Sequence, residues 1–346
     1  GPERSEGGRV PRPPRPERAM PADDLVYYPD SRPGIRRERR GRGFSYVAPD
    51  GTRIDRGPER RRIEALAVPP AYENVWICPL PQGHLQATGY DARSRKQYRY
   101  HPDWRSWRER LKYDELADFG AALPAIRRRI RRDLSHEAGD KDFATAAVLA
   151  MIDRLAIRVG SPEYAEANDS YGATTLTRRH VQLEDDALRL DYRAKGGQRV
   201  TTRLRDRSLA RVLHRLHDLP GRRLVTWLDD HGEPHAVTST HVNDLLSEIT
   251  GRDGVTAKTF RTWAGSEAAL DAALAQERPT IRALSEAAAE RLHNTPAMAR
   301  KSYVHPRVIG LTDVPAEERR ALMENLPRRA GLRQGERALL RLLSDD

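Results

Sequence analysis

The feature that most limits the fold of this chain is a change of sequence pattern near residue 103. Before it, from residue 25 to about residue 101, short β-type runs such as 44–48 and 74–78 alternate with turn-forming Pro, Asp and Gly. After it, apolar residues recur at helical spacing. A chain of 346 residues is long enough for about two domains. The change of pattern therefore predicts a small strand-rich domain followed by a larger, mostly helical one.

One stretch inside the helical part has strand character. Apolar and polar residues alternate there in three short runs, 175–183, 187–193 and 200–204. The glycines of Ala194-Lys-Gly-Gly-Gln suit a tight turn, which places Lys195 at the tip of a hairpin. Further helices are predicted at 113–123, 125–135, 143–158, 208–217, 239–250, 257–274, 280–292 and 296–303, with two more before the C-terminus. The predicted class is α+β, with a three-stranded antiparallel sheet inserted in the helical domain.

The first 21 residues are rich in Pro, Gly and Arg and have almost no apolar side chains. Such a segment has too little apolar surface for a core, so we expect it to be disordered. The predicted organisation is a tail at 1–21, a strand-rich domain at 22–104 and a helical domain at 105–346.

The chain is strongly basic, with 61 Lys and Arg against 50 Asp and Glu and a formal net charge of +11. A basic excess favours a polyanionic partner, most often nucleic acid, because each neutralised phosphate releases counterions. The alternative is that an arginine-rich composition serves solubility. Only six of the basic residues are lysines, so each lysine in a motif is informative.

Several classes of protein and site are excluded or unsupported. The longest nearly apolar run, 143–152, is about half the roughly 20 residues of a transmembrane helix, and no apolar segment near the N-terminus resembles a secretion signal. We therefore expect a soluble cytoplasmic protein. Cys78 is the single cysteine, which excludes an internal disulfide and a zinc site of paired cysteines. Because G-x-x-x-x-G-K-[ST] and H-E-x-x-H patterns are absent, ATP use and zinc hydrolysis are unsupported.

Three residues of the second domain are suited to binding a phosphate, and a tyrosine follows them in the chain. Arg158 ends a mostly apolar helix, where an arginine is costly unless it meets an anion. Lys258 and Arg261 lie at i and i+3 near a helix start, where the helix dipole also favours anions. Tyr303 ends a predicted helix. Each has a plain structural alternative: an arginine that caps carbonyls, a solvated basic face, or a half-buried core tyrosine.

In combination these motifs resemble the small branch of type IB DNA topoisomerases found in bacteria and poxviruses. The segment from His84 to Pro102 is similar to the N-terminal signature of that family. The motifs that follow stand in the family's order: Ile157-Arg-Val-Gly-Ser-Pro-Glu-Tyr, Tyr192-Arg-Ala-Lys-Gly-Gly, Lys258-Thr-Phe-Arg-Thr-Trp and Ser302-Tyr-Val. The resemblance extends from about Asp24 to the C-terminus.

The resemblance implies a role for each matching residue. Tyr303 would be the nucleophile, and the active site would be completed by Arg158, Lys195 as general acid, Arg261 and Asn294, with Lys258 in support. DNA contacts would come from Gln97, Tyr98, Tyr100 and Tyr164. Viral and eukaryotic members have histidine at the place of Asn294; asparagine still donates a hydrogen bond to a phosphate oxygen but has no proton to transfer.

The implied activity is relaxation of supercoiled duplex DNA through a 3′-phosphotyrosyl intermediate, strand rotation and religation. Cationic side chains would take the place of metal ions, so neither a metal, a cofactor nor ATP is expected. The expected partner is duplex DNA, with no membrane and no obligatory protein partner, and the protein would be a nucleoid-associated monomer.

Two alternatives stay open. A tyrosine recombinase shares the Arg, Lys, Arg, Tyr chemistry, but it usually has H-x-x-R where this chain has Lys258-Thr-Phe-Arg261, and its first domain is usually helical. A non-catalytic basic clamp on DNA belongs to another class. The charge alone allows it, but such a clamp would not need Tyr303.

Overall fold

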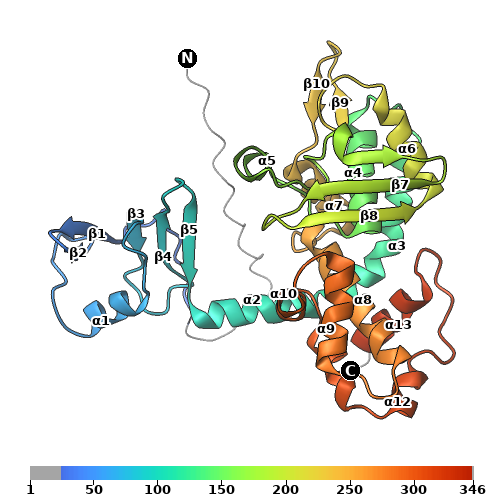
Figure 1. Ribbon diagram of the computed structural model, residues 1–346. Coiled ribbons are helices and arrows are strands. Elements are labelled where there is room, and N and C mark those ends of the chain that lie inside the picture. Colours follow the sequence, from blue (N-terminus) through green and yellow to red (C-terminus); the bar gives the residue numbers. More distant parts are fainter. Residues whose placement is uncertain (1–24, 345–346) are drawn as a thin grey trace. The chain divides into compact units, whose positions relative to one another are not determined.

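The structure is a computed structural model that describes residues 25–344 (Figure 1). The chain divides into two compact units between Lys112 and Tyr113. This division falls inside helix α2 (Pro102–Asp114), not after residue 104, because the helix continues past the point where the sequence pattern changes. The predicted tail, residues 1–21, lies outside the described residues.

The first unit is built on a five-stranded antiparallel sheet in the order β2-β1-β3-β4-β5 (Figure 1). Ile35, Ile77 and Ala87 pair across neighbouring strands and are buried against Ile63 of the helix in this unit. Alternation along the strands thus gives the sheet one apolar face. The elements are β1 (Ile35–Arg40), β2 (Gly43–Val47), α1 (Pro58–Ala65), β3 (Glu73–Ile77), β4 (Leu85–Tyr90) and β5 (Lys96–Tyr100).

The second unit packs its helices around α4, which is buried at every position from Phe143 to Ile152. A helix that is apolar on all sides has to lie at the centre of a unit. Helices α3, α6, α7 and α8 contact it. The helices are α3 (Leu116–Asp133), α4 (Lys141–Leu155), α5 (Pro162–Asn168), α6 (Arg207–His217), α7 (Ser239–Thr250), α8 (Ala257–Ala275), α9 (Ile281–Leu292), α10 (Pro296–Ser302), α11 (Pro306–Gly310), α12 (Ala316–Ala321) and α13 (Gln334–Ser344).

A three-stranded antiparallel sheet is inserted between α5 and α6, in the order β6-β7-β8 (Figure 1). Its strands are β6 (Val181–Leu183), β7 (Ala187–Arg193) and β8 (Arg199–Arg205). The first predicted run, 175–183, forms a strand only at its end, because Arg178–His180 turn as a 3₁₀-helix capped by Thr177. A small hairpin of β9 (Thr226–Leu228) and β10 (Pro234–Ala236) was not predicted. The predicted α+β class and the inserted sheet are confirmed.

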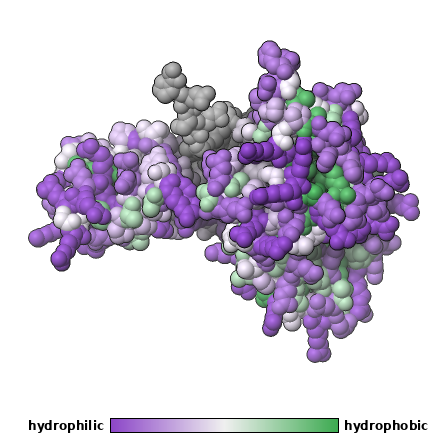
Figure 2. All heavy atoms as spheres, turned by 45° about the horizontal axis from the view of Figure 1, so that its top comes forward, coloured by the Kyte–Doolittle hydropathy of each residue, from purple (hydrophilic) through white to green (hydrophobic). Residues whose placement is uncertain are grey.

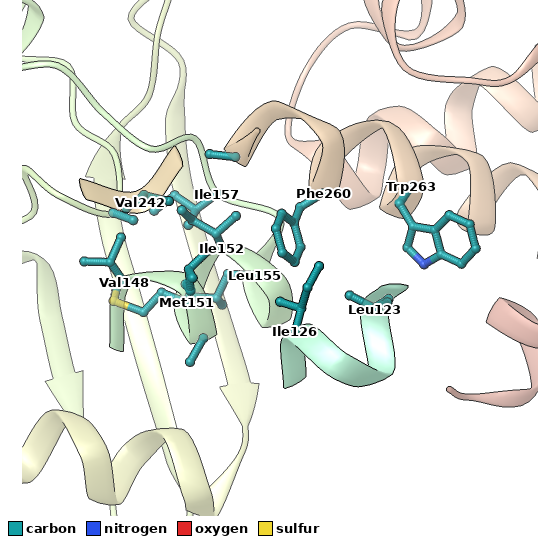
Figure 3. Close-up of a cluster of buried hydrophobic side chains, with 14 of the residues drawn as sticks. Leu123, Ile126, Val148, Met151, Ile152, Leu155, Ile157, Val242, Phe260 and Trp263 are labelled. Carbon is teal, nitrogen blue, oxygen red and sulfur yellow. The ribbon is translucent and has the colours of Figure 1, made fainter. Parts of the chain in front are cut away.

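Helix α8 packs against α3 through aromatic side chains. Figure 3 shows Phe260 and Trp263 on the side of α8 that faces Leu123 and Ile126. Phe119 meets Phe260 and Trp263 edge to face, with ring centroids 5.0 and 5.8 Å apart. This contact fixes the start of α8, which carries two of the predicted site residues.

The surface is polar over most of the face seen in Figure 2, as expected for a chain in which 32% of the residues are charged. In residues 25–344 no helix is both long and apolar enough to cross a membrane.

Candidate active site

The first turn of α8 places Lys258 and Arg261 together. Thr256 and Thr259 form a capping box at the start of this helix, which fixes where its first turn begins. Residues three apart lie on one side of a helix. Arg261 is only 3% exposed, whereas Lys258 is exposed to solvent.

Tyr303 follows α10 directly and lies over these two cations. The Arg261 Cζ atom is 4.9 Å and the Lys258 Nζ atom 5.9 Å from the centre of the Tyr303 ring. The tyrosine is 6% exposed and packs with Ala156, Ala264 and Leu292. Three elements distant in sequence thus meet at one aromatic ring.

The guanidinium of Arg261 is held by two backbone carbonyl groups. Nη1 donates a hydrogen bond to the Ala156 oxygen at 2.5 Å, and Nη2 donates to the Leu292 oxygen at 3.2 Å. Both carbonyls lie at helix ends, just after α4 and at the last residue of α9. The remaining nitrogen, Nε, is buried and has no hydrogen-bond partner.

Asn294 supplies two more unsatisfied atoms two residues after α9 ends. Its side-chain Nδ2 and Oδ1 are both buried without a hydrogen-bond partner. In the described part of the chain six side-chain atoms are in this condition, and three of them belong to Asn294 and Arg261. Because buried polar groups are normally hydrogen-bonded, such a concentration marks a place for a ligand. The free donors suit an oxygen-rich anion such as a phosphodiester.

Arg158 acts on Tyr303 and Arg261 through its positive charge. Burial would raise the pKa of Tyr303, but the positive charge of Arg261, a hydrogen bond from the Arg261 side chain and the charges of Arg158 and Lys258 outweigh burial, so the pKa of Tyr303 lies below its usual value. Burial lowers the pKa of Arg261, and Arg158 lowers it further. Gly172 permits the loop that bears Arg158, since a Cβ there would lie 2.5 Å from the Arg158 oxygen.

Lys195 contacts a different aromatic ring. It is exposed at the tip of the β7–β8 hairpin, where Gly196 and Gly197 have φ angles of 86° and 76°. Its Nζ atom is 5.3 Å from the centre of the Tyr164 ring, in α5. Within the described residues its aromatic contact is thus with Tyr164 and not with Tyr303.

The predicted DNA contacts of the first unit lie on β5. The rings of Tyr98 and Tyr100 stack with centroids 6.0 Å apart. Adjacent strand residues face opposite ways, so Gln97 lies on the other face, where its Nε2 donates to Asp91 Oδ2 at 3.1 Å. The Tyr100 side also carries His84, 6.4 Å from the Tyr100 ring. The structure therefore separates Gln97 from the two tyrosines.

Sequence reasoning missed Tyr192 as a neighbour of the site. It lies on the buried face of β7, and burial raises its pKa to about 12 although Arg261 and Arg158 act in the opposite direction. Two features of the sequence could have indicated this position of Tyr192. Apolar and polar residues alternate along β7, and Tyr192 precedes Lys195 by three residues.

No metal cluster accompanies these residues in the part of the chain that the structure describes. Residues 25–344 contain no group of three or more His, Cys, Asp or Glu that suits a metal ion. A polar cavity of about 360 Å³ borders α8 at Ala264, Glu267 and Asp271, but none of the predicted catalytic residues lines it.

Comparison with known proteins identifies the family. Residues 43–91 match the model of the bacterial DNA topoisomerase IB N-terminal domain, and residues 101–301 match that of the eukaryotic DNA topoisomerase I catalytic core. A DNA topoisomerase 1B of Acanthamoeba polyphaga mimivirus is 30% identical over 286 residues, which cover 78% of this chain and 85% of the viral protein. The chain therefore belongs to the type IB DNA topoisomerases, and its family activity is the isomerisation of DNA topology.

Proposed function

We propose that this protein relaxes supercoiled duplex DNA by transient cleavage of one strand, with Tyr303 as the nucleophile and neither ATP nor metal. The observation that carries this proposal is the tyrosine over Arg261 and Lys258, together with the unsatisfied Nε of Arg261 and the unsatisfied amide of Asn294. A non-catalytic clamp would need no tyrosine with a lowered pKa at such a place.

The bond exchange is balanced. Tyr303 Oη gives its proton to water and bonds to phosphorus, while the bond from phosphorus to the 5′-oxygen breaks and that oxygen takes a proton from Lys195. One phosphate ester replaces another, so the free strand rotates and the reverse step reseals it without an external energy source.

Cations at the site stabilise the transition state. Charge gathers on the non-bridging phosphate oxygens, where Arg158, Arg261 Nε and Asn294 Nδ2 would donate. Losing one preorganised donor of this kind costs about 2.7–4 kcal/mol. Lys258 supports the same phosphate from the exposed side of α8.

The proton for the 5′-oxygen comes from Lys195. Arginine is not deprotonated in proteins, whereas lysine is, and such general acid catalysis contributes about 10²–10⁴ in rate. Lys195 has to leave the Tyr164 ring to reach the leaving group. Two glycines in its turn allow the hairpin tip to change conformation.

Duplex binding involves both units. Tyr98 and Tyr100 of the first unit and Tyr164 of the second contact the DNA, and Gln97 contributes from the other face of β5. The protein acts as a nucleoid-associated monomer without a protein partner.

Plasmid relaxation tests the proposal. The parent protein, with EDTA and without ATP, is expected to relax supercoiled plasmid and to form a covalent adduct with DNA, while Tyr303→Phe does neither. Tyr171→Phe is the matched control, because that hydroxyl binds Asp169 elsewhere in the second unit. Relaxation by Tyr303→Phe at the parental rate, or an inactive parent, contradicts the proposal.

A further inference from the structure

Ser266 connects the helix of the cations to the backbone of the proposed nucleophile. It lies on α8, five residues after Arg261, and is 0% exposed. Its Oγ donates a hydrogen bond to the Tyr303 oxygen at 3.0 Å and accepts one from the His305 nitrogen at 3.0 Å. One side chain therefore binds the backbone on both sides of Val304.

This is unusual for a serine inside a helix, which commonly bonds a carbonyl of its own preceding turn. Ser285 of α9 does so: its Oγ donates to the Ile281 oxygen at 2.6 Å. The Ser266 hydroxyl instead reaches residues 37 and 39 positions away. Its hydrogen bonds serve the contact between α8 and the tyrosine segment and not the helix itself.

The backbone of α8 also comes unusually close to the tyrosine at Gly265. A Cβ on this glycine would lie 3.2 Å from Tyr303 Cβ and 2.9 Å from Leu292 Cδ1. A side chain at this position would thus push the tyrosine away from α8. Gly265 allows the approach, and Ser266 then fixes it.

Tyr303 needs such a fixed point because its own helix holds it weakly. Helix α10 has seven residues, and Tyr303 already leaves the helical conformation with φ −133° and ψ −17°. Its nitrogen still donates to the Ala299 oxygen at 2.9 Å. Its carbonyl, beyond the last turn, bonds to Ser266.

We propose that Ser266 is a positioning residue, which sets the distance of the Tyr303 hydroxyl from the cations of α8. Ser266, Arg261 and Lys258 lie on one helix. A hydrogen bond from that helix to the tyrosine backbone therefore fixes the position of the nucleophile relative to the cations. The inference rests on the proposed function of Tyr303. A misplacement of a reacting group by 1 Å costs about 10²-fold in rate.

The test compares Ser266→Ala with Ser285→Ala in single-turnover cleavage of a duplex oligonucleotide. Both variants lose a buried serine hydroxyl that binds a backbone carbonyl. We expect Ser266→Ala to form the covalent adduct about 10²-fold more slowly at saturating DNA, with the Kd for the duplex unchanged, and Ser285→Ala to cleave at the parental rate. Thermal unfolding shows whether both variants are folded. If Ser266→Ala does not fold, Ser266→Cys replaces it in the cleavage assay, because cysteine has a similar volume and forms a weaker hydrogen bond.

The pH profile separates positioning from a general loss of stability. A tyrosine released from Ser266 moves away from cations that hold its pKa low, so the rising limb of cleavage rate against pH shifts to higher pH in Ser266→Ala. Parental cleavage by Ser266→Ala, an equal loss in both alanine variants, or a slower rate with an unshifted profile overturns the inference. If the parent forms no adduct, the proposed function itself has failed.

Discussion

At the scale of single residues, Arg261 divides two tasks among the nitrogens of one guanidinium. Nη1 and Nη2 bind the ends of α4 and α9 through the Ala156 and Leu292 carbonyls, and Nε, which has no hydrogen-bond partner, is the nitrogen that we propose for the phosphate. A lysine has a single nitrogen and lacks this planar fork, so it is no substitute here. Lys195 is proposed to act differently, through a proton that it can donate and a position that it can change.

Lys195→Ala gives a test at this scale. Cleavage of an ordinary duplex is expected to slow by about 10²–10⁴-fold, because the 5′-oxygen lacks its proton donor. A substrate with a 5′-thio leaving group needs no proton, so its cleavage should recover in the variant. The assay is single-turnover adduct formation on both substrates.

The matched control is Lys141→Ala, since Lys141 also lies over an aromatic ring, that of Trp227, in the second unit. This variant should cleave both substrates like the parent. An equal deficit of Lys195→Ala on both substrates would remove the lysine from the acid role.

At the scale of elements, α8 carries its functional residues on several faces. Its first turn presents Lys258 and Arg261, and Ser266 binds the tyrosine segment. Another side reaches α13, where Trp263 Nε1 donates to Glu336 Oε2 at 2.9 Å. The same carboxylate, 0% exposed, pairs with Arg127 of α3 at 3.0 Å. The C-terminal helix therefore anchors the helix of the cations.

Glu336→Ala is expected to destabilise the second unit by about 1–3 kcal/mol, because it leaves the buried indole NH of Trp263 without an acceptor and removes one of the two carboxylates that pair with Arg127. Asp153, which also pairs with Arg127 at 2.9 Å, retains part of the network. Chemical denaturation measures the loss. Glu286→Ala, which breaks an exposed pair with Arg282 on α9, should leave the unfolding midpoint almost unchanged; similar losses in both variants would refute the role assigned to Glu336.

At the scale of the whole molecule, the proposed tasks fall to different units. The first unit offers the stacked tyrosines of β5 and a set of aromatic rings that includes His84 and Trp104, 4.9 Å apart. The second unit holds the residues that we propose for the reaction. Affinity and chemical rate should therefore respond to different substitutions.

Replacing both Tyr98 and Tyr100 by alanine is expected to raise the Kd for duplex DNA at least tenfold, since both half-buried rings lose their DNA contact. The cleavage rate at saturating DNA should stay parental, because no residue of the second unit changes. Fluorescence anisotropy and single-turnover cleavage measure the two quantities. A parental Kd would show that this face of β5 does not bind DNA.

Much of this organisation was predictable from the sequence, since periodicity reports local structure. The change of pattern near residue 103 predicted the order of strands and helices, and the motifs singled out Arg158, Lys258, Arg261 and Tyr303, which the structure brings together. Contacts between distant segments leave no such pattern. The bonds of Ser266 to residues 303 and 305 are set by packing alone.

The stacking of Lys195 on Tyr164 depends in the same way on how a hairpin and a short helix meet, which no spacing of residues encodes. The boundary of the units was hidden too, because α2 continues through it. For Gln97, the alternation of β5 was already readable in the sequence, and it places this residue opposite Tyr98.

The two carbonyl contacts of Arg261 have a consequence for the order of folding. The bond to Leu292 spans 31 residues within consecutive helices, whereas the bond to Ala156 spans 105. Closing a longer loop costs more conformational entropy. The bond to Leu292 is therefore expected to form before the bond to Ala156. Arg261 is fully held only after α4 has docked. A partly unfolded chain in which α4 is undocked thus bears Tyr303 without a fully held Arg261, so the proposed strand cleavage would require the native second unit.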